Sequence, residues 1–163
     1  MSSGISKISY QTQVSLVSLA QAPSDSKSVA EVLSALAQEG IVIDMISQTA
    51  PRGSFISVSF SLADEMLPKA LSVLAKKKAK YAEIQSEVLP GNCKIAFYDA
   101  DMVGTPGVAA RVFSILADAG IQIMLITTSD VDISILVSSH DLPRALEAVC
   151  SAFGVEPMEA SQA

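Results

Sequence analysis

Two segments of this sequence combine residue types that could bind a small charged molecule. Asp44 stands in the apolar segment Ile43-Asp44-Met45-Ile46, and a buried carboxylate without a partner is costly. It therefore either faces solvent or an interface, or receives a cationic ligand group such as an ammonium. Gly104-Thr105-Pro106-Gly107 predicts the start of a helix, with Thr105 as its cap and Pro106 at the first helical position. The N-terminus of such a helix can hold a small carboxylate.

Other polar groups favour neither catalysis nor a metal centre. Asp99 and Asp101 have no His, Cys or third acid at ligand spacing, so we interpret them as solvated loop acids. His140 has no nucleophile nearby in the sequence, so no catalytic triad is indicated. No Gly-Lys-Ser/Thr follows the glycine-containing loop, which excludes the usual phosphate-binding loop. We therefore expect no catalytic residue, no bound metal and no cofactor in this chain.

The composition narrows the class of protein. Half of the 163 residues are hydrophobic but only 5% are aromatic, so the core must consist of Ala, Val, Ile and Leu. The net charge of -6 argues against a nucleic-acid partner. No apolar run approaches the roughly 18 residues that a membrane span needs, and residues 1–4 lack a signal-peptide pattern. With Cys93 and Cys150 interpreted as buried, reduced thiols, we expect a cytoplasmic protein without a membrane partner.

An internal repeat organises the chain. Residues 30–49 (AEVLSALAQEGIVIDMISQT) align with residues 110–129 (ARVFSILADAGIQIMLITTS) at a fixed offset of 80 positions. The similarity continues downstream, where Leu67-Pro68 corresponds to Leu142-Pro143. Two copies of one supersecondary unit are therefore present, and the fold is predicted for each copy separately.

Both copies predict the same order of elements, with hydrophobic periodicity switching between the helical and the strand pattern. The first copy predicts strands at 14–19, 41–47, 55–62 and 81–88 and helices at 28–38 and 64–76. The second predicts strands at 94–98, 121–128 and 133–137, a helix that Gly120 ends, and a helix through Phe153. This β-α-β-β-α-β order is that of the ferredoxin-like fold. We expect the domains at 14–89 and 93–156, a break at 90–92, and a frayed tail at 157–163.

The segment PGVAARVFSILADAGIQIMLITTSDVDIS, from Pro106 to Ser134, resembles the second ACT domain of bacterial aspartokinases. ACT domains are small amino-acid sensors, and this family carries two per chain. The resemblance extends over nearly all of residues 4–155. It implies an α+β chain of two ferredoxin-like ACT domains. It also implies that the spare strand at 4–10 completes the second sheet, so that the first domain is nested within the second.

The same resemblance implies a regulatory role rather than catalysis. The chain would be the allosteric region, or a separate regulatory subunit, of an aspartokinase, acting on a catalytic domain or subunit that phosphorylates L-aspartate. An end-product amino acid would bind and cause feedback inhibition, with lysine the first choice and threonine or meso-diaminopimelate next. The effector would lie between the first ACT domain of one chain and the second of another, in a homodimer. The positions that correspond to the family's effector site are Asp25, Ile43, Asp44, Gln48, Val108, Ala109, Gln122, Ile123, Ser129 and Asp130.

The first copy departs from the family in the loop before its first helix. Ungapped alignment places Ser24, Ser26 and Lys27 where the family has the Asp, Pro and Gly of Asp-x-Pro-Gly, and Asp25 lies one residue from the expected acid. Lys27 would bring a positive charge to a site that binds an amine. The usual preference for lysine or threonine therefore does not transfer directly.

Two alternatives stay open. The chain could be a dimerisation module of the same fold that has lost its ligand. It could also be an enzyme of the same fold, such as an acylphosphatase. That activity needs an anion-binding loop with an Arg and a positioned Asn, and neither Arg52 nor Arg111 stands in such a loop.

Overall fold

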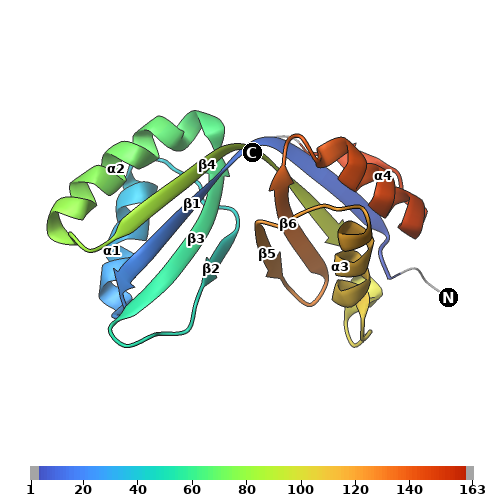
Figure 1. The fold of residues 1–163 in the computed structure, drawn as a ribbon, viewed down its shortest axis with the longest axis horizontal. Coiled ribbons are helices and arrows are strands. Elements are labelled where there is room, and N and C mark those ends of the chain that lie inside the picture. Colours follow the sequence, from blue (N-terminus) through green and yellow to red (C-terminus); the bar gives the residue numbers. More distant parts are fainter. Residues whose placement is uncertain (1–3, 161–163) are drawn as a thin grey trace. The chain divides into compact units, whose positions relative to one another are not determined.

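The structure, a computed structural model, describes residues 4–160 and divides the chain into two compact units (Figure 1). Gln13–Pro90 forms the first-repeat unit. The segment up to Thr12, together with the segment from Gly91 onward, forms the second-repeat unit. Both units are α+β, with mainly antiparallel strands and helices against one sheet face, which confirms the predicted fold class.

In the first-repeat unit the strands are ordered β2-β3-β1-β4, with β1 and β2 antiparallel to β3. Val17 pairs with Phe60 across β1 and β3, and both side chains are buried with Leu36 of α1 and Ala70 of α2 in one core. The elements are β1 (Lys7–Pro23), α1 (Ser26–Gln38), β2 (Ile46–Gln48), β3 (Phe55–Ala63), the short 3-10 helix η1 (Asp64–Met66), α2 (Leu67–Lys80) and β4 (Gln85–Tyr98).

The second-repeat unit continues from β4 and has the order β1-β4-β6-β5, with β7 beside β1. Ile95 of β4 pairs with Ile135 of β6 in antiparallel register. Ile8 of β1 pairs with Pro157 of β7 in parallel register. The rings of Phe97 and Phe153 lie 6.4 Å apart in this unit's core. Its further elements are the 3-10 helix η2 (Ala100–Met102), α3 (Val108–Asp118), β5 (Leu125–Thr128), β6 (Asp132–Ser138), α4 (Leu142–Phe153) and β7 (Pro157–Glu159).

The alternation predicted for β3 is confirmed. Ile56, Val58 and Phe60 are buried in the core beneath the helices. The intervening serines lie on the other face, where the hydroxyls of Ser18 and Ser59 are 3.0 Å apart. A strand with period-two hydrophobicity buries one face only, which leaves the opposite face to hydroxyl groups.

The second strand of each repeat is shorter than predicted. β2 covers only Ile46–Gln48 instead of 41–47, and β5 covers only Leu125–Thr128 instead of 121–128. Each preceding segment follows a glycine with positive φ and first turns a buried isoleucine, Ile41 or Ile121, into the core. Because the chain first leaves the helix and buries this isoleucine, it begins to pair with the neighbouring strand only some residues later.

The two units divide between Pro90 and Gly91, within the predicted break at 90–92, but the strand itself does not end there, and the predicted frayed tail is wrong. β4 runs without interruption through Gly91, whose φ of 73° allows a local change of direction. β1 likewise unites the predicted strands 4–10 and 14–19, with Gln13 at φ 57°. Pro157–Glu159 forms β7; residues 161–163 of the predicted tail lie outside the described part.

The predicted cap of α3 is also wrong. The helix begins at Val108, and its N-cap is Gly107, with φ at 91°. The Thr105 hydroxyl instead donates to the carbonyl oxygen of Asp101, at 2.8 Å. Only a residue without a Cβ adopts this left-handed conformation readily, so Gly107 rather than Pro106 makes the transition into the helix.

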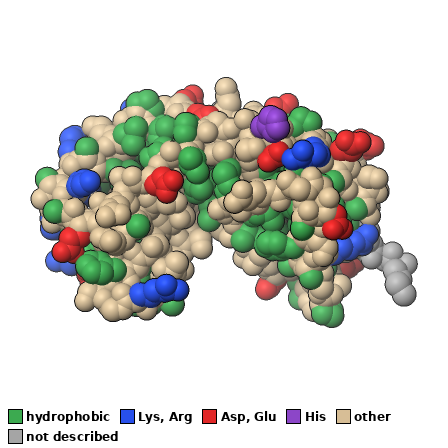
Figure 2. Space-filling model, viewed as in Figure 1, with side chains coloured by type: hydrophobic (Ala, Val, Ile, Leu, Met, Phe, Trp, Pro, Cys, Tyr) green, Lys and Arg blue, Asp and Glu red, His purple; other side chains and the backbone are tan. Residues whose placement is uncertain are grey.

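Within residues 4–160, no helix combines the length and apolarity needed to cross a bilayer. Figure 2 shows acidic and basic side chains interspersed over the viewed face, without a broad basic patch.

Candidate functional site

Each unit has a surface pocket at the start of its first helix. The α3 pocket, of about 320 Å³, lies in the second-repeat unit, and the α1 pocket, of about 210 Å³, lies in the first-repeat unit. The α3 pocket is lined by Met102, Val103, Gly104, Thr105, Gly107, Val108, Ala109, Thr128, Ser129, Asp130 and Ile133. The α1 pocket is lined by Ser24, Asp25, Ser26, Val29, Ala30, Leu33, Gln48 and Ile56.

The two pockets occupy corresponding places in the repeat. Both are bounded by the loop before the helix, its first turn and the end of the unit's short edge strand. Val29 and Ala109 are equivalent at the offset of 80 positions, as are Gln48 and Thr128. The internal repeat therefore produced two pockets of the same architecture, and their chemical differences come from individual side chains.

In the α1 pocket, a carboxylate of the protein itself occupies the N-terminus of the helix. Asp25 is the N-cap of α1, and it accepts hydrogen bonds from the backbone N–H of Ser28 at 2.8 Å and from the Ser28 hydroxyl at 2.6 Å. The hydroxyl, followed by the backbone amide, lowers the pKa of Asp25 because both donors favour its charged form. The pocket thus presents a fixed negative charge where an incoming carboxylate would otherwise bind.

The helix end in the α3 pocket carries no such side chain. Gly107 has no side chain to accept from the first-turn amides, and its own carbonyl accepts from the Arg111 N–H at 2.9 Å. Across the pocket, Ser129 and Asp130 form the turn after β5. This turn is fixed by Ser129 N–H donating to the Asp132 carbonyl at 2.8 Å. One end of the pocket therefore favours an anion, and the exposed Asp130 offers a carboxylate for a cation.

The structure distributes the ten sequence-derived site residues over both units. Asp25 and Gln48 line the α1 pocket. Val108, Ala109, Ser129 and Asp130 line the α3 pocket. The four remaining residues, which lie before the short edge strands, line neither pocket: Ile43, Asp44, Gln122 and Ile123.

Two of those four are apolar and pack against the cores, namely Ile43 and Ile123. Asp44 and Gln122 have exposed side chains. The backbone N–H of Asp44 donates to the Ser61 carbonyl at 3.2 Å, which holds the segment beside β3. The Asp44 carboxylate therefore lies at the surface, where solvent or another molecule can reach it.

Sequence reasoning missed several lining residues. Thr128 could have been found, because it is the repeat equivalent of Gln48. Met102 and Val103 carry no such signal: Met102 lies in the short helix η2, and Val103 is 59% exposed.

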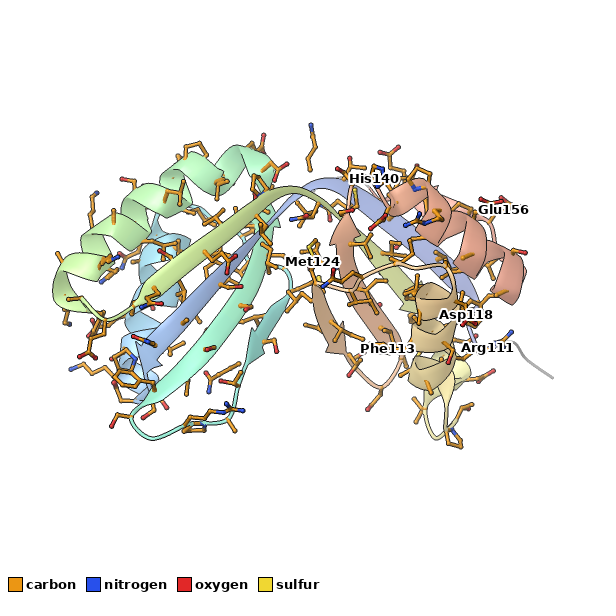
Figure 3. The ribbon with its side chains drawn as sticks, viewed as in Figure 1. Arg111, Phe113, Asp118, Met124, His140 and Glu156 are labelled. Atoms are coloured by element: carbon orange, nitrogen blue, oxygen red, sulfur yellow. The ribbon has the colours of Figure 1, made fainter. Side chains whose placement is uncertain are left out.

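Asp99 and His140, which the sequence raised as possible metal-binding and catalytic residues, each have a neighbour in the structure that accounts for their position. Asp99 is buried rather than solvated, contrary to prediction, because it caps η2 by accepting from the Asp101 N–H at 2.7 Å. The His140 side chain is 91% exposed and lies 3.3 Å from Asp141, beside the start of α4 (Figure 3). Among residues 4–160, no three His, Cys, Asp or Glu side chains gather as metal ligands would.

Comparisons with known proteins agree with this architecture. Residues 95–153 match the ACT domain family. An aspartokinase from Geobacillus stearothermophilus is 36% identical over 148 residues, which are 91% of this chain and 35% of that protein. The regulatory subunit of aspartate kinase from Thermus thermophilus, in a ligand-free form, superposes with a TM-score of 0.83 at 28% identity, covering 92% of this chain and 99% of that one.

The chain is a relative of the aspartokinase regulatory region. It spans about a third of the length of the curated aspartokinases that it matches, and its similarity to the Thermus subunit extends over nearly the whole of both chains. Aspartokinase III from E. coli, in complex with lysine and aspartate, shares the fold at a TM-score of 0.71 and 22% identity, covering 91% of this chain and 33% of that one. In this relative of the aspartokinase regulatory region, the α1 and α3 pockets are the candidate sites for a small ligand.

Proposed function

We propose that this chain is an allosteric regulatory region or subunit that binds an end-product amino acid and so controls an aspartokinase catalytic domain. The observation that supports this most directly is the pairing of features in the α3 pocket. Uncapped amides at the start of α3 and the carboxylate of Asp130 line the same hollow. An amino acid carries both the carboxylate and the ammonium group that such a pair would bind.

Lysine is the first candidate effector, followed by threonine and meso-diaminopimelate. E. coli aspartokinase III was solved with lysine, although that likeness extends to the fold alone. In this chain, Asp130 and Asp44 are exposed carboxylates that could receive ammonium groups. Lys27 lies beside the α1 pocket, next to lining residue Ser26, and would oppose a second cation there.

The regulatory mechanism follows from differential affinity. An effector that binds one arrangement of the assembly more tightly shifts the population toward it, and the coupling to catalysis equals the difference in binding free energy. We propose a homodimer formed through the ACT domains as that assembly. Phosphorylation of L-aspartate itself would reside in the partner domain or subunit.

A ligand-free dimerisation module is the second candidate function. It is favoured by the exposed apolar side chains beside the edge strand β2, where Val42 is 69% and Ile46 is 45% exposed. An exposed strand edge with apolar side chains readily pairs with another chain. The Asp25 carboxylate already occupies the N-terminus of α1, which is also what a pocket that no longer binds a ligand carboxylate would show.

A thermal-shift screen of the twenty amino acids and meso-diaminopimelate separates the two. A ligand at about 100 times its dissociation constant adds roughly 2.7 kcal/mol to the free energy of unfolding, which is several degrees in Tm for a protein of this size. Asp130→Asn should reduce the shift, whereas Asp118→Asn, an exposed acid on α3 outside the pocket, should preserve it. If no amino acid changes Tm at millimolar concentration, the sensor function is wrong and the dimerisation module stands.

A further inference from the structure

Arg111 connects the first turn of α3 to the last turn of α4 (Figure 3). Its guanidinium Nη2 donates to the backbone carbonyl of Ala152 at 2.9 Å. The same group stacks on the Phe153 ring, with 4.6 Å between the guanidinium carbon and the ring centroid. A cation at the carbonyl end of a helix meets the negative end of its dipole, and the stacking adds a cation–π attraction.

The repeat places a residue of opposite charge at the corresponding position of the other unit. Glu31 of α1 is equivalent to Arg111 at the offset of 80 positions. Its Oε2 accepts from Lys80 Nζ at 2.6 Å and from the Tyr81 hydroxyl at 2.8 Å, at the end of α2. Both units thus tie the first helix to the end of the second helix through the same sequence position, with unrelated chemistry.

The two connections differ in the helix that they join: α3, which Arg111 joins to α4, has no side-chain cap at its N-terminus, whereas α1, which Glu31 joins to α2, is capped by Asp25. The Arg111 N–H closes the first turn of α3 on the carbonyl of Gly107, and two residues of that turn, Val108 and Ala109, line the α3 pocket. In the other unit, Asp25 fixes the start of α1 independently of Glu31. Val108 fixes this turn on the core side, and the Arg111 side chain is the polar group that holds it from the exposed side.

We propose that Arg111 is a positioning residue for the α3 pocket, which holds the uncapped first turn of α3 in the orientation that binds a ligand carboxylate. This inference rests on the proposed function, because it concerns the same pocket. Arg111 does not line the pocket, so it acts through the turn rather than by touching the ligand. Preorganised donors cost less to order on binding, and loss of the anchor should weaken binding without removing any direct contact.

The test compares Arg111→Met with the matched variant Glu31→Met, which removes the corresponding connection in the other unit. Titration calorimetry with L-lysine and with L-threonine gives the dissociation constant, which refers to the folded protein and is not changed by a loss of stability alone. Hydrogen exchange in the ligand-free protein gives a second measure. The Val112 amide reports on the first turns of α3, and the Ile135 amide in the centre of β6 reports on opening of the whole unit.

Arg111→Met should raise the dissociation constant about tenfold and accelerate exchange at Val112 by a similar factor, with Ile135 unchanged. Glu31→Met should alter neither quantity. Equal acceleration at Val112 and Ile135, or an unchanged dissociation constant in Arg111→Met, would overturn the positioning role. If the wild-type protein binds neither amino acid and no other amino acid changes Tm in the thermal-shift screen, the proposed function fails, and the exchange rates alone decide whether Arg111 fixes the turn.

Discussion

Ser28 donates both its backbone N–H and its hydroxyl to the carboxylate of Asp25, at 2.8 and 2.6 Å. Ser28 is buried, at 5% exposure, so this pair of hydrogen bonds stands at the edge of the first-repeat core. No equivalent pair is found at α3, where the N-cap is a glycine. The two helices have the same place in the repeat, but one supplies its own terminal anion and the other does not.

Asp25→Ala should lower the Tm of the protein, because the cap that satisfies the start of α1 is lost. Ser26→Ala is the matched control, since Ser26 is the exposed first residue of α1 and should give little change. Thermal unfolding followed by circular dichroism measures both variants. Equal Tm values for Asp25→Ala and Ser26→Ala would show that the Asp25 cap contributes nothing measurable.

The hydrogen bonds of Glu31 should make stability depend on pH. The pKa of Glu31 lies below its ordinary value of 4.5, first because Lys80 donates to it and second because Tyr81 does. A lowered pKa in the folded state means that the stabilisation is present above about pH 4.5 and is lost as the pH falls through the lower, folded value. Wild type should therefore exceed Glu31→Gln in stability at pH 6, and the difference should shrink below pH 4.5.

Urea denaturation across this pH range measures the effect, with Glu83→Gln as a control at an exposed acid of the same unit. A constant difference between wild type and Glu31→Gln from pH 6 to pH 3 would contradict the assignment. The connection between α1 and α2 would then owe its strength to contacts that do not titrate.

The fold was predictable because its signals are periodic. The alternation in β3 and the repeat offset of 80 positions each extend over many residues, so a few exceptions do not hide them. The continuity of β4 was not predictable, because Pro90-Gly91-Asn92 has the composition of a turn. Only the tertiary context, in which the residues on both sides of Gly91 extend one strand, decides that the chain continues.

Gly91→Ala should destabilise the protein by roughly 1–2 kcal/mol, because a left-handed conformation places Cβ against the following carbonyl. The position is otherwise open, since a Cβ there would meet no atom within 4 Å. Gly91→Asn should cost less than Gly91→Ala, because Asn tolerates positive φ better. Chemical denaturation measures both, and an alanine variant as stable as the asparagine variant would show that φ at this position is not the constraint.

Leu116→Ala should cost about 2–5 kcal/mol, the range for removing a fully buried leucine. Leu116 has no exposed surface and lies in the core of the second-repeat unit. Ser114→Ala, an exposed position on the same helix, should change stability by less than about 0.5 kcal/mol. Comparable losses in the two variants would mean that α3 is not packed as described.

The candidate site was predictable only in part. Residues at a helix start, such as Val108 and Ala109, have a local signal in the glycines that precede them. Asp44 was singled out because it interrupts an apolar segment. The pattern does not show that strand pairing begins only at Ile46, so it could not predict that Asp44 lies outside the α1 pocket. The connection made by Arg111 has no sequence signature, because its partner is a backbone carbonyl 41 positions away.

The parallel pairing of Ile8 with Pro157 joins the first strand of the chain to the last one described. During synthesis, the N-terminal half of β1 therefore leaves the ribosome almost a full chain length before β7 emerges. Gln13–Pro90 can form its compact unit in the meantime, because all of its own strands are already present. Until β7 emerges, the edge of β1 at Ile8 lacks this partner, and an unpaired strand edge can pair with another chain made on the same messenger RNA.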